Sequence, residues 1–184
     1  MLLVRLPCGD LDDVRRVLEE NLGSKWGWVV YRITYGDDAE WERFMNHLNT
    51  RVRLELEAEG NGDLFSRIDW AVQDDLKLED ASIRKVREHL RRWVEQDGGE
   101  NDLGTARFHA CVVVGQDELE SVLEDGPPAE EVDVDGMGWV TVVSLNEEEG
   151  DTAVGLSYLT RAYALSECPG WHTIAVGDGD VYCR

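Results

Sequence analysis

The acid–base chemistry that this sequence could support centres on a histidine and a carboxylate in two apolar segments. His109 lies in the run RFHACVVV, and Asp69 lies in the run LFSRIDWAV. A histidine that transfers protons needs a carboxylate to orient its ring and a substrate proton within reach. If the two runs are adjacent strands, Asp69 could orient His109, and the chain would be a small enzyme without a metal. The alternative is that Asp69 faces solvent and His109 has no chemical role.

Large aromatic side chains mark a second kind of site, a binding pocket. The stretch WGWVVYRITYGDDAEWERF carries Tyr31 and Tyr35 at alternating strand positions, so both point to one face of a sheet. Together with Trp70 they could line a cavity and offer polar groups to a ligand. If Asp69 is buried, Arg32 on the neighbouring strand could be its partner, because a buried carboxylate needs a counter-ion. The alternative for Asp69 is exposure to solvent. The alternative is that the tyrosine hydroxyls reach water at the sheet edge.

Other chemical motifs are not found in the sequence. The four cysteines (Cys8, Cys111, Cys168 and Cys183) form no CxxC pair, and no histidine stands at zinc-ligand spacing. The string at 131–136, EVDVDG, resembles the start of a calcium loop, but Val142 stands where the bidentate carboxylate belongs. The chain also lacks a serine-nucleophile elbow, a phosphate-binding glycine loop and a dinucleotide fingerprint. We therefore predict no metal and no cofactor.

The charge of the chain excludes some partners. The net charge is −21, and residues 98–184 hold 18 Asp and Glu against three Lys and Arg. Such a field repels nucleic acids and anionic membranes. One region is basic: Arg84, Lys85, Arg87, Arg91 and Arg92 lie on the outer face of a predicted helix. These residues could pair with carboxylates of the same chain, of an acidic partner or of a second copy in a homodimer.

The apolar pattern predicts alternating strands and helices. Asp10 caps a helix that carries Leu11, Val14, Leu18 and Leu22 on one face and that Gly23 can stop. Asp37 caps a long helix to residue 58, and Asp80 or Ser82 caps a second long helix. Strands are predicted at 26–35, 64–72, 106–114 and 139–145. Shorter helices are predicted at 117–123 and 156–165, an exposed linker at 126–136, an acidic loop at 98–104, and a terminal hairpin of 173–176 with 181–183. The run 26–35 is apolar on both faces and should be a central strand.

These elements predict one α+β domain, with helices packed on a mixed sheet of four to six strands. The arrangement should be ferredoxin-like or like a dimeric α/β barrel, with a doubly wound sheet as the alternative. Residues 1–25 would form an N-terminal helical extension, 26–145 the core and 146–184 a less regular tail.

Part of the sequence resembles a known group of proteins. The string WGWVVYRITYGDDAEWERF, followed by MNHLNTRVRLEL and LFSRIDWAVQDD, is similar to a widespread uncharacterised fungal protein family. The resemblance covers about residues 26–75. It implies no activity and assigns no role to any residue.

The sequence thus favours a domain that binds a small molecule or a protein partner. Its site residues would be Tyr31, Arg32, Tyr35 and Trp70. The alternative is a metal-free isomerase, cyclase or cofactor-free oxygenase in which His109 and Asp69 act as acid and base. Residues 1–7 are too short for a secretory signal core, so a cytoplasmic location is expected.

Overall fold

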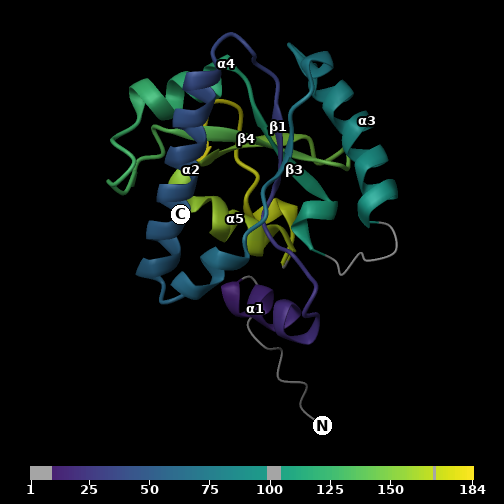
Figure 1. Cartoon of the computed structure of the whole chain (residues 1–184), viewed down its shortest axis with the longest axis vertical. Coiled ribbons are helices and arrows are strands. Elements are labelled where there is room, and N and C mark those ends of the chain that lie inside the picture. The colour runs from purple at the N-terminus through teal and green to yellow at the C-terminus, as the bar shows by residue number, and fades with distance from the viewer. Residues whose placement is uncertain (1–9, 99–104, 168) are drawn as a thin grey trace.

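The computed structural model of the chain describes residues 10–98, 105–167 and 169–184, which form helices packed on one six-stranded sheet (Figure 1). The strands are β1 (Val29–Arg32), β2 (Ala71–Gln73), β3 (Ala110–Val114), β4 (Trp139–Ser144), β5 (Asp151–Gly155) and β6 (Val181–Tyr182). The α-helices are α1 (Leu11–Glu20), α2 (Asp38–Ala58), α3 (Ile83–Trp93), α4 (Gln116–Glu120) and α5 (Leu159–Glu167). The predicted α+β class with a mixed sheet is confirmed.

The sheet has a parallel half and an antiparallel half. Its strand order is β2-β1-β3-β4-β5-β6. β1 is parallel to both of its neighbours, with Val29 opposite Ala71 in β2 and Cys111 in β3. β3, β4 and β5 are antiparallel, and β6 is parallel to β5. The predicted central position of the first strand is confirmed, and all four of its residues are buried.

Helices cover both faces of the sheet. On one face Val29 and Tyr31 of β1 share a core with Val86 and Leu90 of α3. On the other face Val30 belongs to a larger core that α1, α2 and α5 complete, through the residues Leu11, Val14, Leu18, Phe44, Leu48, Leu159 and Ala162. The alternation along β1 follows from the two-residue period of a strand. α1 is therefore part of the main core. The prediction that Leu22 belongs to its buried face is wrong, because α1 ends at Glu20 and Leu22 is 88% exposed.

This layering bears on the finer fold predictions. α2 and α3 follow β1 and β2 on opposite faces, as in the doubly wound alternative. The antiparallel half of the sheet departs from that arrangement. The ferredoxin-like arrangement is not confirmed, because it would place the helices together on one face.

The three helix starts are confirmed where side chains cap them. Asp10 accepts a hydrogen bond from the backbone N–H of Asp12, and Asp37 accepts from those of Ala39 and Glu40. Ser82, one of the two predicted residues, accepts from the N–H of Lys85. Each cap satisfies backbone donors that the first helical turn leaves unpaired.

The segments that enter β2 and β3 are not extended as predicted. Gly62–Arg67 and Ala106–Phe108 are short 3-10 helices, and the strands begin only after them. A short apolar run does not by itself distinguish a strand from another buried segment. The predicted terminal hairpin is wrong, because β6 pairs with β5. The sequence pattern did not predict β5, whose residues are DTAVG.

Some predictions cannot be followed in the structure. Those on residues 1–7, Cys8, Cys168 and the loop at 99–104 lie outside the described residues. Cys111 is fully buried, as expected of a small core residue. None of the helices in the described ranges combines the length and the apolar character needed to span a bilayer.

Candidate functional site

The amino ends of three parallel strands bring chemically useful residues to one edge of the sheet. Lys25 precedes β1, Asp69 precedes β2, and Arg107 precedes β3. The backbones before β1 and β2 are close, since the N–H of Asp69 donates to the carbonyl of Trp26 over 2.8 Å. Gly27 has a φ of +110°, and a Cβ there would lie 3.0 Å from the Asp69 carbonyl oxygen. The close approach therefore favours glycine at this position.

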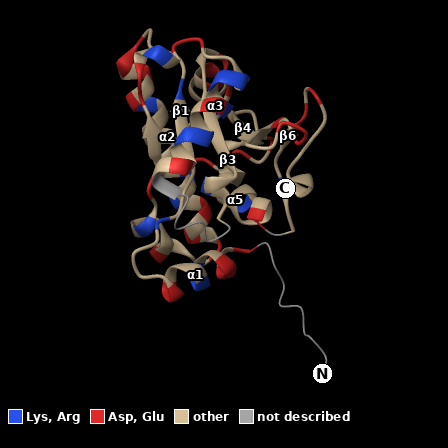
Figure 2. Ribbon diagram, turned by 90° about the vertical axis from the view of Figure 1, so that its right-hand side faces the viewer, with Lys and Arg blue, Asp and Glu red and all other residues tan. Residues whose placement is uncertain are grey.

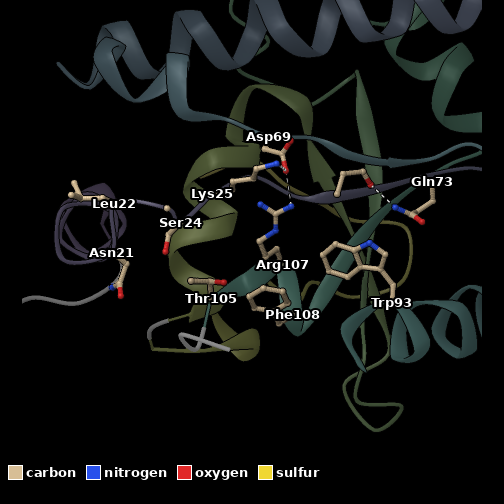
Figure 3. Close-up of a pocket in the computed structure, with 12 residues that line it drawn as sticks. Asn21, Leu22, Ser24, Lys25, Asp69, Gln73, Trp93, Thr105, Arg107 and Phe108 are labelled. Atoms are coloured by element: carbon tan, nitrogen blue, oxygen red, sulfur yellow. Dashed lines mark hydrogen bonds and ion pairs between the residues drawn. The ribbon is translucent and has the colours of Figure 1, made fainter. Parts of the chain in front are cut away.

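A cavity of about 750 Å³ opens at this edge (Figure 3). Its walls are residues 21–25, Asp69 and β2, Trp93 at the end of α3, and residues 105–108. Its volume is in the range of small-molecule sites. In Figure 3 the guanidinium of Arg107 lies in the middle of the labelled side chains, with Asp69 on one side and Thr105 on the other.

The charged groups of this cavity do not balance. Arg107 Nη2 lies 3.0 Å from Asp69 Oδ2, and Lys25 Nζ lies 3.5 Å from the same oxygen. Two cations thus share one carboxylate. The Arg107 side chain is only 6% exposed, whereas those of Asp69 and Lys25 are 36% and 66% exposed. A positive charge is held in a largely dehydrated position, in a chain of net charge −21.

Two residues that line the cavity, Thr105 and Arg107, carry buried polar atoms, and the buried Tyr163 lies beside Thr105 in the core. Arg107 Nη1 has no hydrogen-bond partner in the described part of the chain, whereas the Tyr163 hydroxyl lies close to the Thr105 side chain and the Arg107 backbone without a well-formed hydrogen bond to either. Burial raises the pKa of Tyr163, which therefore stays a neutral phenol, and the charges of Glu167 and Arg107 act on it in opposite directions. An unpaired buried donor costs about 1–3 kcal/mol. Such a cost at a cavity is typical of a place where a ligand or an ordered water completes the network.

The cavity also offers a flat apolar wall. Trp93 and Phe108 are half-buried and stacked, with ring centroids 5.9 Å apart and an interplanar angle of 24°. The Arg107 guanidinium carbon lies 5.8 Å from the Trp93 ring centroid. Stacked rings next to a cation form a surface on which a planar ligand can pack.

Glu167 is the last residue of α5 and is hydrogen-bonded to the start of the 105–108 segment. Its Oε1 accepts a hydrogen bond from the Ala106 N–H over 2.9 Å. Burial raises the pKa of Glu167 to about 7. The folded protein therefore holds a proton on Glu167 that the unfolded chain has already lost above its ordinary pKa of 4.5.

This proton gives a testable pH dependence. Because the folded state binds the proton more tightly, the stabilisation is complete below pH 4.5 and is lost as the pH rises through about 7. We expect Glu167→Gln, which stays neutral, to remove this part of the dependence. Between pH 5 and 8 the free energy of unfolding should fall by about 2 kcal/mol more in the wild type than in the variant, less than the full conversion because part of the side chain reaches water. Urea unfolding at several pH values measures this, and parallel curves would contradict the assignment.

The four predicted ligand residues lie in three places. Tyr31 faces α3, where its hydroxyl lies 2.9 Å from His89 Nδ1. Trp70 faces α2 and donates its indole N–H to Asn49. Arg32 and Tyr35 lie together at the carboxyl end of β1, with the Tyr35 hydroxyl donating to the Arg32 carbonyl.

The carboxyl end of β1 is the usual ligand position in a parallel sheet, but its charges are already paired. Arg32 is buried, and its guanidinium contacts Asp38 at 2.6 Å and Asp74 at 3.4 Å. Two carboxylates therefore oppose one cation. The prediction that Arg32 pairs with Asp69 is wrong, because Asp69 pairs with Arg107, 38 positions along the chain.

The structure does not place Asp69 and His109 on adjacent strands. β1 lies between β2, which Asp69 precedes, and β3, which His109 precedes. His109 is exposed and lines a different cavity, of about 460 Å³, with Ser144 and Trp171. The condition on which the predicted acid–base pair depended is therefore not met.

Lys25, Thr105 and Arg107 were not predicted as site residues. One signal in the sequence was available for Arg107, which is the only Lys or Arg between residues 98 and 160. Many carboxylates surround this single cation in the sequence, so the pattern does not identify the one with which it forms an ion pair. Its actual partner depends on the strand order, which the sequence pattern did not give.

The comparisons with known proteins give no further assignment. No protein-family model, no curated protein and no solved structure matches this chain. The resemblance to a fungal family stays a prediction. Within residues 10–98, 105–167 and 169–184, no three His, Cys, Asp or Glu side chains are grouped as metal ligands would be.

Proposed function

We propose that this protein binds a small organic anion, with its acidic group at Arg107 and Lys25 and its flat part against Trp93 and Phe108. The observation that supports this most is the buried Arg107 guanidinium, whose terminal nitrogen Nη2 pairs with Asp69 while the other terminal nitrogen, Nη1, has no partner among the described residues. A carboxylate would accept from this donor and offset the excess positive charge of the cavity.

A monoanion fits the cavity better than a dianion. Among the described residues that line the cavity, Asp69 contributes one negative charge, so Lys25 and Arg107 leave a balance of one positive charge. A phosphate dianion would exceed that balance in a protein whose total charge is −21. The Trp93–Phe108 stack favours an aromatic or otherwise planar carboxylate.

Small-ligand binding was predicted from the sequence, and the proposal moves it from the tyrosines of β1 to the amino end of the sheet. The cytoplasmic location stays part of the proposal. The enzyme alternative is not carried further, because the structure does not bring its acid–base pair together.

Isothermal titration with benzoate, benzamide and inorganic phosphate tests this function. We expect benzoate to bind more tightly than the other two. Lys25→Met should weaken benzoate binding severalfold without disturbing the Arg107–Asp69 pair, and Arg107→Met should weaken it at least tenfold, since a hydrogen bond to a charged group is worth about 1.5–3 kcal/mol.

Arg53→Met is the matched control. Arg53 also lies over an aromatic ring, that of Phe65, with its guanidinium carbon 4.9 Å from the centroid, but outside the cavity. Its replacement should leave benzoate affinity unchanged. Equal affinity of folded wild type, Lys25→Met and Arg107→Met for benzoate would contradict the proposal, as would tighter binding of benzamide.

A further inference from the structure

Exposed apolar side chains gather in one loop of the molecule. Five large hydrophobic residues are exposed in the described part of the chain, and three of them, Val132, Val134 and Met137, lie within six positions. Their exposed fractions are 61%, 64% and 53%. Single exposed apolar residues need no explanation, whereas a group of them marks an interaction site.

Two buried side chains, Arg51 and Asp133, fix the conformation of the loop at 127–138. Arg51 of α2 is buried and donates hydrogen bonds to the carbonyls of Pro127, Pro128 and Ala129 and to Ser157 Oγ. Asp133 is 3% exposed, and its carboxylate accepts from the backbone N–H groups of Met137 and Gly138.

A further hydrogen bond fixes the loop, since the Tyr158 hydroxyl donates to the Val134 carbonyl. The sequence predicted an exposed linker here. The structure instead shows a supported loop, which lies beside α2 in Figure 1. Its apolar side chains Val132, Val134 and Met137 are exposed.

A small apolar cavity adjoins this loop. It has a volume of about 160 Å³, room for one Leu- or Met-sized side chain, and its apolar lining comes from Leu54, Ala58, Val132 and Tyr158. Glu55 and Glu59 also line it. A well-formed apolar pocket beside flat exposed surface is typical of the anchor point of a protein interface.

The loop beside this cavity is acidic, whereas the lining itself carries Glu59 together with two arginines, and burial raises the pKa of Glu55 to about 8. Glu59, Glu130, Glu131 and Asp135 are exposed around it or in the adjoining loop. Two arginines line the cavity. Arg51 lies 4.0 Å from the carboxylate of Asp133, which opposes its charge, whereas Arg161 is not paired with Asp133. Acidic residues also recur in the loops beside β6 (Figure 2). The surface therefore attracts positive charge.

We propose that the cavity between α2 and the loop at 129–138 docks a basic segment of another protein, which inserts one apolar side chain between Leu54, Ala58, Val132 and Tyr158. Lysine and arginine side chains flanking the anchor would meet Glu59, Glu130 and Glu131. Charge complementarity sets the partner class and speeds its approach, and the anchor gives specificity. The site shares no lining residue with the Arg107 cavity and does not depend on it.

The basic face of α3 in a second copy is a less suitable occupant. Arg84 pairs with Glu88, Arg91 pairs with Glu147, and Arg87 donates to the Ser144 carbonyl. These intramolecular contacts use the charges that an acidic surface would need. A separate basic partner meets no such competition.

Fluorescence anisotropy with two labelled peptides tests the proposal. The first is Lys-Arg-Ser-Lys-Leu-Ser-Arg-Lys, and the second has Ser in place of the central Leu, so that both carry the same charge. We expect the Leu peptide to bind the wild-type chain at least fivefold more tightly. Ala58→Trp, an exposed position whose new ring would fill the cavity, should abolish that difference while leaving the weak, salt-sensitive binding of both peptides.

Leu76→Ser is the matched control, since Leu76 is 69% exposed on another part of the surface and its replacement should preserve the preference. Equal affinity of the wild type for both peptides would overturn the proposal, and so would a preference that survives Ala58→Trp. Sedimentation of the protein alone is the second measurement. A dimer that Ala58→Trp dissociates would show that a second copy is the occupant, which would also overturn it.

Discussion

Replacing Arg51 by Met should lower the free energy of unfolding by about 3–5 kcal/mol, because it removes one partner of a buried ion pair and several buried hydrogen bonds. The Arg51 side chain is 2% exposed, and its Nη2 lies 2.7 Å from the Pro127 carbonyl and 3.1 Å from that of Pro128. Its loss would leave these oxygens, the Ala129 carbonyl and the Asp133 charge without a cationic donor.

Chemical denaturation of the wild type and the Met variant measures this loss. Arg53→Met is a suitable control, since Arg53 lies two positions along the same helix and is exposed, and its replacement should change stability by less than about 1 kcal/mol. Arg51→Lys should recover little, because an ammonium group does not reproduce the planar fork of donors. A loss below about 1 kcal/mol for Arg51→Met would mean that the loop at 127–138 is held by other contacts.

Trp28→Ala should lower the free energy of unfolding by a similar amount, about 3–5 kcal/mol, through a different mechanism. Trp28 is 1% exposed, and its indole N–H donates to the Leu159 carbonyl over 3.1 Å. Its ring also packs edge-to-face on Tyr163, with centroids 5.1 Å apart. The substitution would create a large cavity between the sheet and α5 and leave the Leu159 carbonyl without that donor.

Trp28→Phe separates these contributions, because it keeps most of the buried ring and loses the hydrogen bond. The free energy of unfolding of Trp28→Phe should lie between those of the wild type and the Ala variant. Leu22→Ala is the control at an 88% exposed position and should change stability by less than about 0.5 kcal/mol. If Trp28→Ala unfolded at the same denaturant concentration as the wild type, that result would contradict the packing of Trp28 against α5.

Local signals allowed much of the fold to be predicted from the sequence. α2 begins after the predicted cap Asp37 and ends at Ala58, and β1 is the buried central strand that its apolar residues indicated. Such signals act over a few residues: a carboxylate that accepts from the next turn, or an apolar side chain at every third or fourth position.

Features that depend on distant partners were not predictable in this way. β5 has only five residues, DTAVG, and becomes a strand because β4 and β6 pair with it on both sides. The predicted strand at 64–72 includes Leu64–Arg67, yet these residues belong to the 3-10 helix Gly62–Arg67 before β2. In both cases pairing or packing with a distant segment decides the structure, and local composition does not.

The candidate site shows the same limit. The sequence singled out Asp69 and left two alternatives, exposure to solvent or pairing with Arg32. The structure shows a side chain 36% exposed that pairs with Arg107. Arg107 is its partner because β1 separates β2 from β3 and brings their amino ends to one edge. Tyr31 and Tyr35 were grouped by alternation, but β1 ends at Arg32, so Tyr35 lies beyond the strand in which that alternation holds.

The most direct test of the proposed anion site is a benzoate titration followed by amide and indole NMR signals. The largest shifts should occur at Lys25, at the Trp93 indole and at the amides of 105–108, and should saturate with a single affinity. Shifts concentrated instead at Tyr31, Arg32 and Tyr35, or an unchanged spectrum at saturating benzoate, would contradict binding at the amino end of the sheet.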